Sequence, residues 1–250
     1  MTFGILYITY GKKYVEAALR SAWTARAKNP DVPIHLFVDA PSRDALGLAK
    51  DPGPFTSIGI IENPHRRSKV DCMSKTPYER TLYLDSDTSV AQNISEIFGV
   101  LERFDLAAVH AMHRNSSMGN EHWKEQLPRA FPQFNTGVIL YRNSPAVLAM
   151  LEQWGKAFAE SGHRHDQPTF RELVWQSDIR SIALPPEYNV RYIKYKYIWS
   201  QAEAVPMIYH LKEYHRGWQR TWIVNPVNLL LKPFGVRWDT FAKKFGWPRW

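Results

Sequence analysis

Short apolar, β-rich runs alternate along the chain with stretches of helical spacing, and this alternation restricts the fold more than any other feature. The clearest helical stretch is 13–29. Its predicted core face carries Val15, Leu19, Ala22 and Trp23. Strands that alternate with helices predict an α/β fold with a mostly parallel, twisted sheet flanked by helices. The predicted strands are 3–9, 34–39, 57–62, 81–85, 106–111 and 136–141.

The chain has the size and composition of one large globular domain. It has 250 residues, 44% of them hydrophobic, and no run approaches the roughly 20 apolar residues that a membrane span needs. The first residues lack the basic region and cleavage site of a signal peptide, so they are predicted to form a strand. The single cysteine, Cys72, excludes an internal disulfide and is typical of a reducing compartment. We therefore expect a cytoplasmic protein.

The predicted strand 81–85 ends in two acidic residues, Asp85 and Asp87, separated by one serine. Ligands of parallel α/β sheets bind beyond the carboxyl ends of the strands, and two neighbouring carboxylates favour a cation between them. Four interpretations compete. They are an EF-hand calcium loop, a phosphatase of the haloacid dehalogenase type, a metal site for a sugar nucleotide, and a solvated turn in which Asp85 caps a helix.

Two of these interpretations fit the sequence poorly. In an EF-hand, Val90 would occupy the position that needs glycine for its sharp turn. A haloacid dehalogenase would need a second paired-acid motif late in the chain, and none is present. Taken alone, the D-x-D pattern is common in solvated turns.

Further motifs accompany the two aspartates. Lys69 lies sixteen residues before Asp85. The later motifs are FNTGVILY (134–141), HDQPTF (165–170), LPPEYN (184–189) and IYHLKEYHRGW (208–218). Their order and spacing resemble the glycogenin and lipopolysaccharide galactosyltransferase group of retaining glycosyltransferases, which have the GT-A fold. The resemblance covers about residues 3–218.

The resemblance implies a metal site and a phosphate-binding lysine. Asp85 and Asp87 match the family aspartates that bind Mn²⁺, and His210 matches the late histidine that completes the site. Mixed oxygen and nitrogen ligands suit Mn²⁺ better than Mg²⁺, which remains the second choice. Lys69 stands where the family has a lysine near the diphosphate. Without the motif, His210 would be interpreted as an ordinary core or surface histidine.

The resemblance also implies residues for the sugar and the nucleotide. Asp166 and Gln167 match a pair on the reactive face of the donor sugar, although Asp166 could also cap the helix that follows it. On this basis the expected catalytic residues are Asp166, Gln167, Lys69 and Asn135, and the expected sugar contacts are Asn135, Thr136, Gly137, Asp166 and Gln167. The expected nucleotide contacts are Ile8, Thr9, Tyr10, Tyr14, Lys69 and Arg216. For Tyr10 and Tyr14, ordinary packing is an equal alternative.

The closing motif departs from the family pattern H-F-x-G-x-x-K-P-W. Glu213 replaces the glycine that lets the backbone approach a phosphate, and Arg216 replaces the lysine that steadies the departing diphosphate. Arginine can serve that role with a bidentate contact. An acid near a diphosphate is harder to accommodate, so either Glu213 points away or the chain is a non-catalytic relative.

The C-terminus is basic and aromatic. The net charge is +8, and residues 216–250 hold seven of the 32 lysines and arginines but one acid. Within 236–247, aromatic residues fall on one helical face and cations on the other, a pattern of helices that lie in a membrane interface. A docked terminal helix is an equal alternative. We expect a catalytic domain over 1–218 and a tail over 219–250 that contacts an anionic membrane surface.

Together these features predict a metal-dependent retaining glycosyltransferase. The expected partners are a nucleotide-sugar donor, with UDP as the nucleotide, and a glycan or glycolipid acceptor at the inner face of the membrane. Two alternatives stay open. One is a sugar-nucleotide-binding relative without turnover, and the other is a basic membrane or nucleic-acid binding protein, with nucleic acid the less favoured partner.

Overall fold

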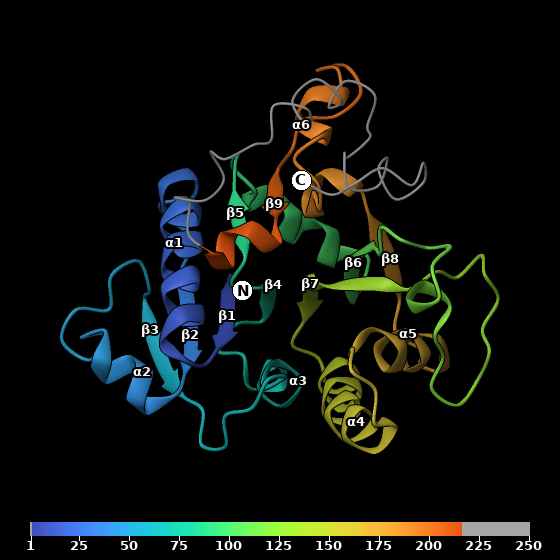
Figure 1. Ribbon diagram of the computed structural model, residues 1–250, viewed down its shortest axis with the longest axis horizontal. Coiled ribbons are helices and arrows are strands. Elements are labelled where there is room, and N and C mark those ends of the chain that lie inside the picture. The colour runs from blue at the N-terminus through green and yellow to red at the C-terminus, as the bar shows by residue number, and fades with distance from the viewer. Residues whose placement is uncertain (1, 217–250) are drawn as a thin grey trace, which may run out of the picture.

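The computed structural model describes residues 2–216 and has a seven-stranded sheet at its centre (Figure 1). The strand order is β3-β2-β1-β4-β7-β6-β8. β7 pairs antiparallel with both neighbours, and every other pair in this sheet is parallel. The strands are β1 Phe3–Thr9, β2 Ile34–Val38, β3 Ser57–Ile60, β4 Arg80–Leu84, β6 Leu106–His110, β7 Phe134–Arg142 and β8 Ser181–Leu184. The predicted mostly parallel α/β sheet is therefore confirmed.

A second sheet of two short strands lies beyond the end of β4. It pairs β5 (Thr88–Val90) with β9 (Ile208–His210) in antiparallel register, so that Thr88 faces His210. Neither strand was predicted, because three residues carry too little periodicity to be recognised. Through this pairing, a segment from the end of the described chain lies beside the residues that follow β4.

Helices cover both faces of the central sheet, and successive residues of β1 alternate between two hydrophobic clusters. Ile5 and Tyr7 pack against α1, whereas Leu6 and Ile8 pack in the cluster formed with α3, α4 and α5. Figure 1 shows α3, α4 and α5 together below the sheet. The helices are α1 Lys12–Lys28, α2 Ala40–Ala45, α3 Lys69–Cys72, α4 Pro145–Ser161, α5 Gln167–Gln176 and α6 Tyr195–Ile198. The 3-10 turns are η1 Met73–Lys75, η2 Ser95–Glu102, η3 Met118–Asn120, η4 Pro186–Asn189 and η5 Lys212–Arg216.

α1 confirms the predicted helix, but the prediction that Trp23 lies on its core face was wrong. Trp23 is 55% exposed, whereas Val15 and Ala22 are fully buried. The buried stripe is made of small residues (Val15, Ala18, Ala22 and Ala25), which let the helix approach the sheet closely. The bulky indole of Trp23 lies at the border of that stripe and remains in contact with solvent.

Helix α5 is fastened to the loop that precedes β7 by two buried charged side chains. Glu172 accepts hydrogen bonds from the backbone N–H groups of Trp123, Lys124 and Glu125, at 3.0–3.1 Å. The guanidinium of Arg171 donates to backbone carbonyls of the same loop, including that of Phe131 at 2.7 Å. Because hydrogen bonds to charged groups are stronger than neutral ones, this clamp fixes α5 relative to the start of β7.

No helix within residues 2–216 is both long and apolar enough to cross a membrane. The basic, aromatic tail that the sequence analysis assigned to 219–250 lies outside the described residues.

Candidate active site

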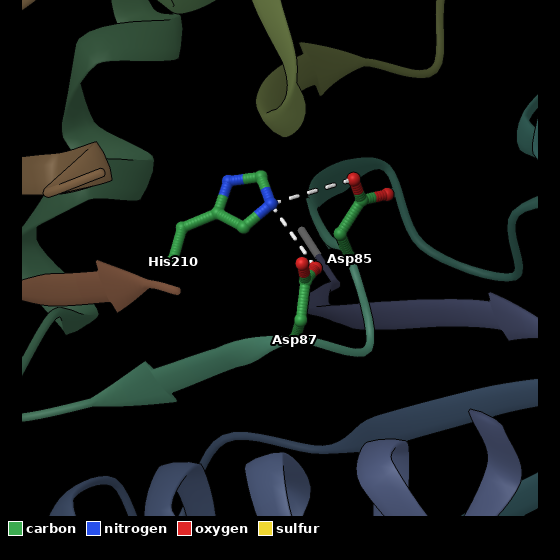
Figure 2. Close-up of side chains that lie close together, drawn as sticks. All are labelled: Asp85, Asp87 and His210. Carbon is green, nitrogen blue, oxygen red and sulfur yellow. Dashed lines mark ion pairs between the residues drawn. The ribbon is translucent and has the colours of Figure 1, made fainter. Parts of the chain in front are cut away.

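Three side chains that could ligate a metal ion, here called the metal-ligand cluster, converge beyond the end of β4. Asp85 and Asp87 lie in the turn between β4 and β5, and His210 is the last residue of β9 (Figure 2). His210 Nε2 lies 3.1 Å from Asp87 Oδ1 and 3.6 Å from Asp85 Oδ2, and one ligand atom of each residue lies within 4.8 Å of the others. The structure thus brings together all three residues that the sequence predicted as metal ligands.

The tautomer of His210 is set by Asn189, the last residue of η4. Asn189 donates from Nδ2 to Asn135 Oδ1 at 3.0 Å, so its own Oδ1 is left to accept from His210 Nδ1 at 2.9 Å. A histidine that donates from Nδ1 presents its Nε2 lone pair on the other side. That lone pair faces two carboxylates, and such an arrangement calls for a cation or a proton between them. The donor set therefore fits a divalent metal ion.

Gly137 lets the histidine approach β7. A Cβ atom at this position would overlap the His210 ring and lie 2.8 Å from Asp85 Oδ2. The backbone of Gly137 also accepts a hydrogen bond from the N–H of Asp85 at 2.8 Å. The glycine is required here by close packing rather than by an unusual backbone angle, and this explains its place in the N-T-G segment.

Lys69, the first residue of α3, connects the metal-ligand cluster to Asp166. Its Nζ lies 3.6 Å from Asp85 Oδ1 and 2.9 Å from Asp166 Oδ2. It also donates to the backbone carbonyl of Thr136 at 2.9 Å and to the Thr136 hydroxyl at 3.1 Å. Lys69, Thr136 and Asp166 are all buried. The three predicted residues therefore form one polar network under the metal-ligand cluster.

Asp166 occupies the N-cap position of α5, but its side chain makes no capping hydrogen bond. Its carboxylate instead accepts from Thr136 Oγ1 at 3.2 Å and lies 3.9 Å from Arg67 Nη1. Burial alone would raise the pKa of Asp166, but the Lys69 and Arg67 cations outweigh burial and hold that pKa below its ordinary value. The helix-cap interpretation of this side chain is wrong, and Asp166 is ionised at neutral pH. Gln167, the first residue of α5, follows it and is half-buried.

The predicted nucleotide residues lie at the end of β1 and in the turn to α1. Ile8 and Thr9 are buried, Tyr10 is half-buried and Tyr14 is 44% exposed. Asp39, which the sequence analysis missed, shapes this turn, because its carboxylate accepts from the N–H groups of Gly11 at 2.8 Å and Ser42 at 3.0 Å. Gly11 itself has a φ of 81°, which favours glycine.

The closing motif reaches the metal-ligand cluster through a residue that sequence reasoning missed. His215 lies between Ser86 Oγ, at 3.0 Å from its Nε2, and Asp87 Oδ2, at 3.7 Å from its Nδ1. Its ring also packs edge-on against that of Tyr14, with the centroids 5.0 Å apart. Glu213 is exposed, and Arg216 is the last described residue of η5.

Two histidines and an arginine surround Asp87, which is itself buried. Burial alone would raise the pKa of Asp87, but His210, His215 and Arg191 outweigh it and hold the pKa well below its ordinary range. Burial lowers the pKa of His215 more than Asp87 and Asp85 raise it. Asp87 is therefore available as an anionic ligand throughout the neutral range.

The residues predicted from family motifs lie together in the structure, and further residues that were not predicted position them. Asn189 stands in a motif that the sequence analysis quoted, and its role was detectable there. His215 likewise stands in the quoted closing motif. The other missed residues are Asp39, Arg67 and Arg191, which lie outside the quoted motifs and act through tertiary contacts.

The chain was compared with known families and structures. A family model described as nucleotide-diphospho-sugar transferase matches residues 80–228, more than half of the chain. No curated protein sequence matches the chain significantly. The structure of the galactosyltransferase LgtC in complex with donor and acceptor sugar analogues is similar, with a TM-score of 0.60 at 14% identity, covering 96% of this chain and 99% of LgtC.

Two further structures share the fold over part of their length. The glycosyltransferase GlyE of Streptococcus pneumoniae aligns with a TM-score of 0.58 at 17% identity, over 84% of this chain and 55% of GlyE. The bifunctional glycosyltransferase WbbM aligns with a TM-score of 0.56 at 13% identity, over 84% of this chain and 45% of WbbM. At these identities the structures support the fold alone. Given the family match and the fold, the chain belongs to the nucleotide-diphospho-sugar transferase family and is a glycosyltransferase of the GT-A type, resembling the lipopolysaccharide galactosyltransferases.

Proposed function

We propose that this glycosyltransferase moves a hexose from a UDP-sugar to a glycan or glycolipid acceptor, with retention of configuration and with a divalent metal ion, Mn²⁺ or Mg²⁺. One observation carries the proposal. The Lys69 ammonium contacts both Asp85 of the metal-ligand cluster, at 3.6 Å, and the ionised Asp166, at 2.9 Å. This contact supports a site in which the metal-ligand cluster would take the diphosphate and Asp166 the sugar.

The expected division of labour follows from charge. A glycosyl donor leaves negative charge on its diphosphate and positive charge on its sugar as the bond between them breaks. A metal ion bound by Asp85, Asp87 and His210 would supply a Lewis acid for the diphosphate. Lys69 adds a buried cation on the same side, and the ionised Asp166 faces the sugar, so both charges are stabilised most in the transition state. Asn135, Thr136 and Gln167 remain the proposed sugar contacts, and Ile8, Thr9, Tyr10, Tyr14 and Arg216 the proposed nucleotide contacts.

The exposed position of Glu213 supports turnover rather than binding alone. The concern that this acid replaces a family glycine applies only if its carboxylate enters the buried site, and the side chain is in contact with solvent. Membership of a nucleotide-diphospho-sugar transferase family argues against the alternative of a nucleic-acid-binding or membrane-binding protein in which the D-x-D motif has no role.

Nucleotide sugars screened by thermal shift and by donor hydrolysis test this function. We expect UDP-hexoses with Mn²⁺ to raise the melting temperature by several degrees, since a ligand that binds only the folded state stabilises it, and to be hydrolysed slowly to UDP. EDTA should remove both effects. UDP-sugar binding without hydrolysis or transfer would favour a non-catalytic relative, and stabilisation by another nucleotide alone would refute the UDP assignment.

We also propose that the catalytic domain, 1–218, is followed by a membrane-contacting tail, 219–250. The composition of the tail supports this, and so does a described segment. Ile193, Tyr197 and Ile198 are each more than 40% exposed, with Lys194 and Lys196 between them. Each cation near an anionic surface contributes roughly 1 kcal/mol, so several are needed together.

Truncation after residue 228, where the family match ends, is expected to preserve donor hydrolysis and to weaken sedimentation with anionic vesicles severalfold. Full-length protein should lose vesicle binding as salt rises, because salt screens surface charges. Neutral phosphatidylcholine vesicles are the control. A truncated protein with a lower melting temperature, together with weak vesicle binding by the full chain, would contradict the membrane role and make the tail part of the folded body.

A further inference from the structure

Arg191, at the start of the segment after η4, lies beside the metal-ligand cluster. The residue before it, Val190, donates its N–H to the Ile208 carbonyl at 2.8 Å and accepts from the N–H of His210 at 2.9 Å. Val190 and Tyr209 form a parallel bridge, so the next residue on each segment, Arg191 and His210, lie side by side. The backbone of Arg191 is therefore fixed next to a predicted metal ligand.

The guanidinium of Arg191 reaches the charged region of the site and lacks a partner there. Because paired residues of neighbouring strands direct their side chains to the same face, the Arg191 side chain leaves the backbone on the same face as the His210 ring. Its Nη1 is buried and has no hydrogen-bond partner within the described chain. A buried, charged donor without an acceptor is costly, and such groups in native proteins usually have a partner that the unliganded structure does not contain.

The closing motif makes an additional cation useful. At the position where the resembled family has glycine, this chain has Glu213, and the Glu213 side chain is exposed. A guanidinium beside His210 would supply donors on the same side of the site. Arginine forms bidentate hydrogen bonds with phosphate and keeps its charge at all relevant pH values.

We infer that Arg191 binds the diphosphate of the donor directly, as a phosphate ligand additional to Lys69 and to the metal ion. The inference rests on the proposed function, because it assigns a contact within the proposed donor site. The ligand that Arg191 recognises is a phosphate group of a nucleoside diphosphate. The phosphate oxygens accept hydrogen bonds from the buried Nη1 group.

Arg191→Gln and Arg191→Lys test the inference through two binding constants. In Arg191→Gln, UDP affinity at saturating Mn²⁺, measured by calorimetry, should fall by about tenfold or more, since charge-assisted hydrogen bonds to the diphosphate are lost. The affinity for Mn²⁺ alone, measured from the signal of the free ion in electron paramagnetic resonance, should be unchanged or higher, because a cation near Asp87 has been removed. Arg191→Lys should retain UDP affinity within about threefold, because it keeps the charge that attracts the diphosphate. Arg129→Gln, which removes an exposed arginine outside the proposed sites, is the matched control and should behave as wild type.

The outcomes distinguish a failure of the Arg191 assignment from a failure of the proposed function. Wild-type protein that fails to bind UDP with Mn²⁺ would contradict the proposed function. If the wild type binds UDP and Arg191→Gln binds it equally, the inference alone is wrong. A parallel loss of Mn²⁺ and UDP affinity in both variants would also overturn it, because Arg191 would then only support the strand that carries His210.

Discussion

Asp166→Asn is expected to lower the rate of donor hydrolysis and sugar transfer by about 100-fold to 1,000-fold, while UDP affinity stays within about twofold of wild type. The reason is that, in the proposed function, the ionised carboxylate acts on the sugar, whereas the nucleotide contacts the metal ion and other residues. Steady-state rates and calorimetry on the same preparation measure both quantities. Asp178→Asn, an exposed aspartate beyond the other end of α5, should have wild-type rates. A variant of Asp166 with wild-type turnover would refute its role on the reactive face.

The same substitution should also destabilise the protein. Removing one partner of a buried ion pair costs about 3–5 kcal/mol, because it leaves the other charge uncompensated. Lys69 keeps a carboxylate, Asp85, at 3.6 Å, so we expect the lower end of this range for Asp166→Asn. Combining it with Lys69→Met should recover part of the loss, because the buried Lys69 ammonium is then no longer left without the Asp166 carboxylate. Chemical denaturation of the single and double variants measures this coupling.

The pH dependence of stability follows from the direction of the Asp166 pKa. Its folded-state pKa is depressed below the ordinary value of 3.8. Stability from this group is therefore complete above the unfolded-state pKa and is lost as the pH falls through the folded-state value. Between pH 5 and 8, Asp166 stays ionised, so any acidic limb of the activity profile in that window must come from another group. In Asp166→Asn, the loss of stability below pH 4 should be shallower than in wild type.

Asp87→Ala is the second large effect, and it acts on binding rather than on the chemical step. Mn²⁺-dependent UDP binding should weaken by at least about 100-fold, since even residues that only support a metal ligand contribute 10-fold to 100-fold to metal affinity. EDTA supplies an internal control, because the residual UDP affinity of Asp87→Ala should equal that of wild type in EDTA. If Mn²⁺ strengthened UDP binding equally in both proteins, the metal site would have to lie elsewhere.

Much of this protein could be predicted from its sequence, because the signals involved are local. Alternating apolar runs and helical spacing predicted the mostly parallel sheet, and the chain from Lys12 to Lys28 is helical as its periodicity indicated. Asp85 and Asp87 are separated by one residue and directly follow a buried strand, so their proximity can be recognised from the local sequence. His210 and Asp166 were found through a family resemblance, since nothing in their immediate neighbours separates a ligand from an ordinary core histidine or helix cap.

Tertiary structure alone decided how these residues act together. Lys69, Thr136 and Asp166 come from distant parts of the chain, and only packing of α3 and α5 on one face of the sheet puts their polar atoms within 3.2 Å of one another. The tautomer of His210 depends on Asn189, and the position of Arg191 depends on a bridge to Tyr209. Periodicity describes which face of an element is buried, but it carries no information about which buried polar groups meet. By itself the sequence therefore predicted the fold and the residue types of the candidate site. The contacts that lower the pKa values of Asp87 and Asp166 join segments far apart in the chain, so only the tertiary structure decided them.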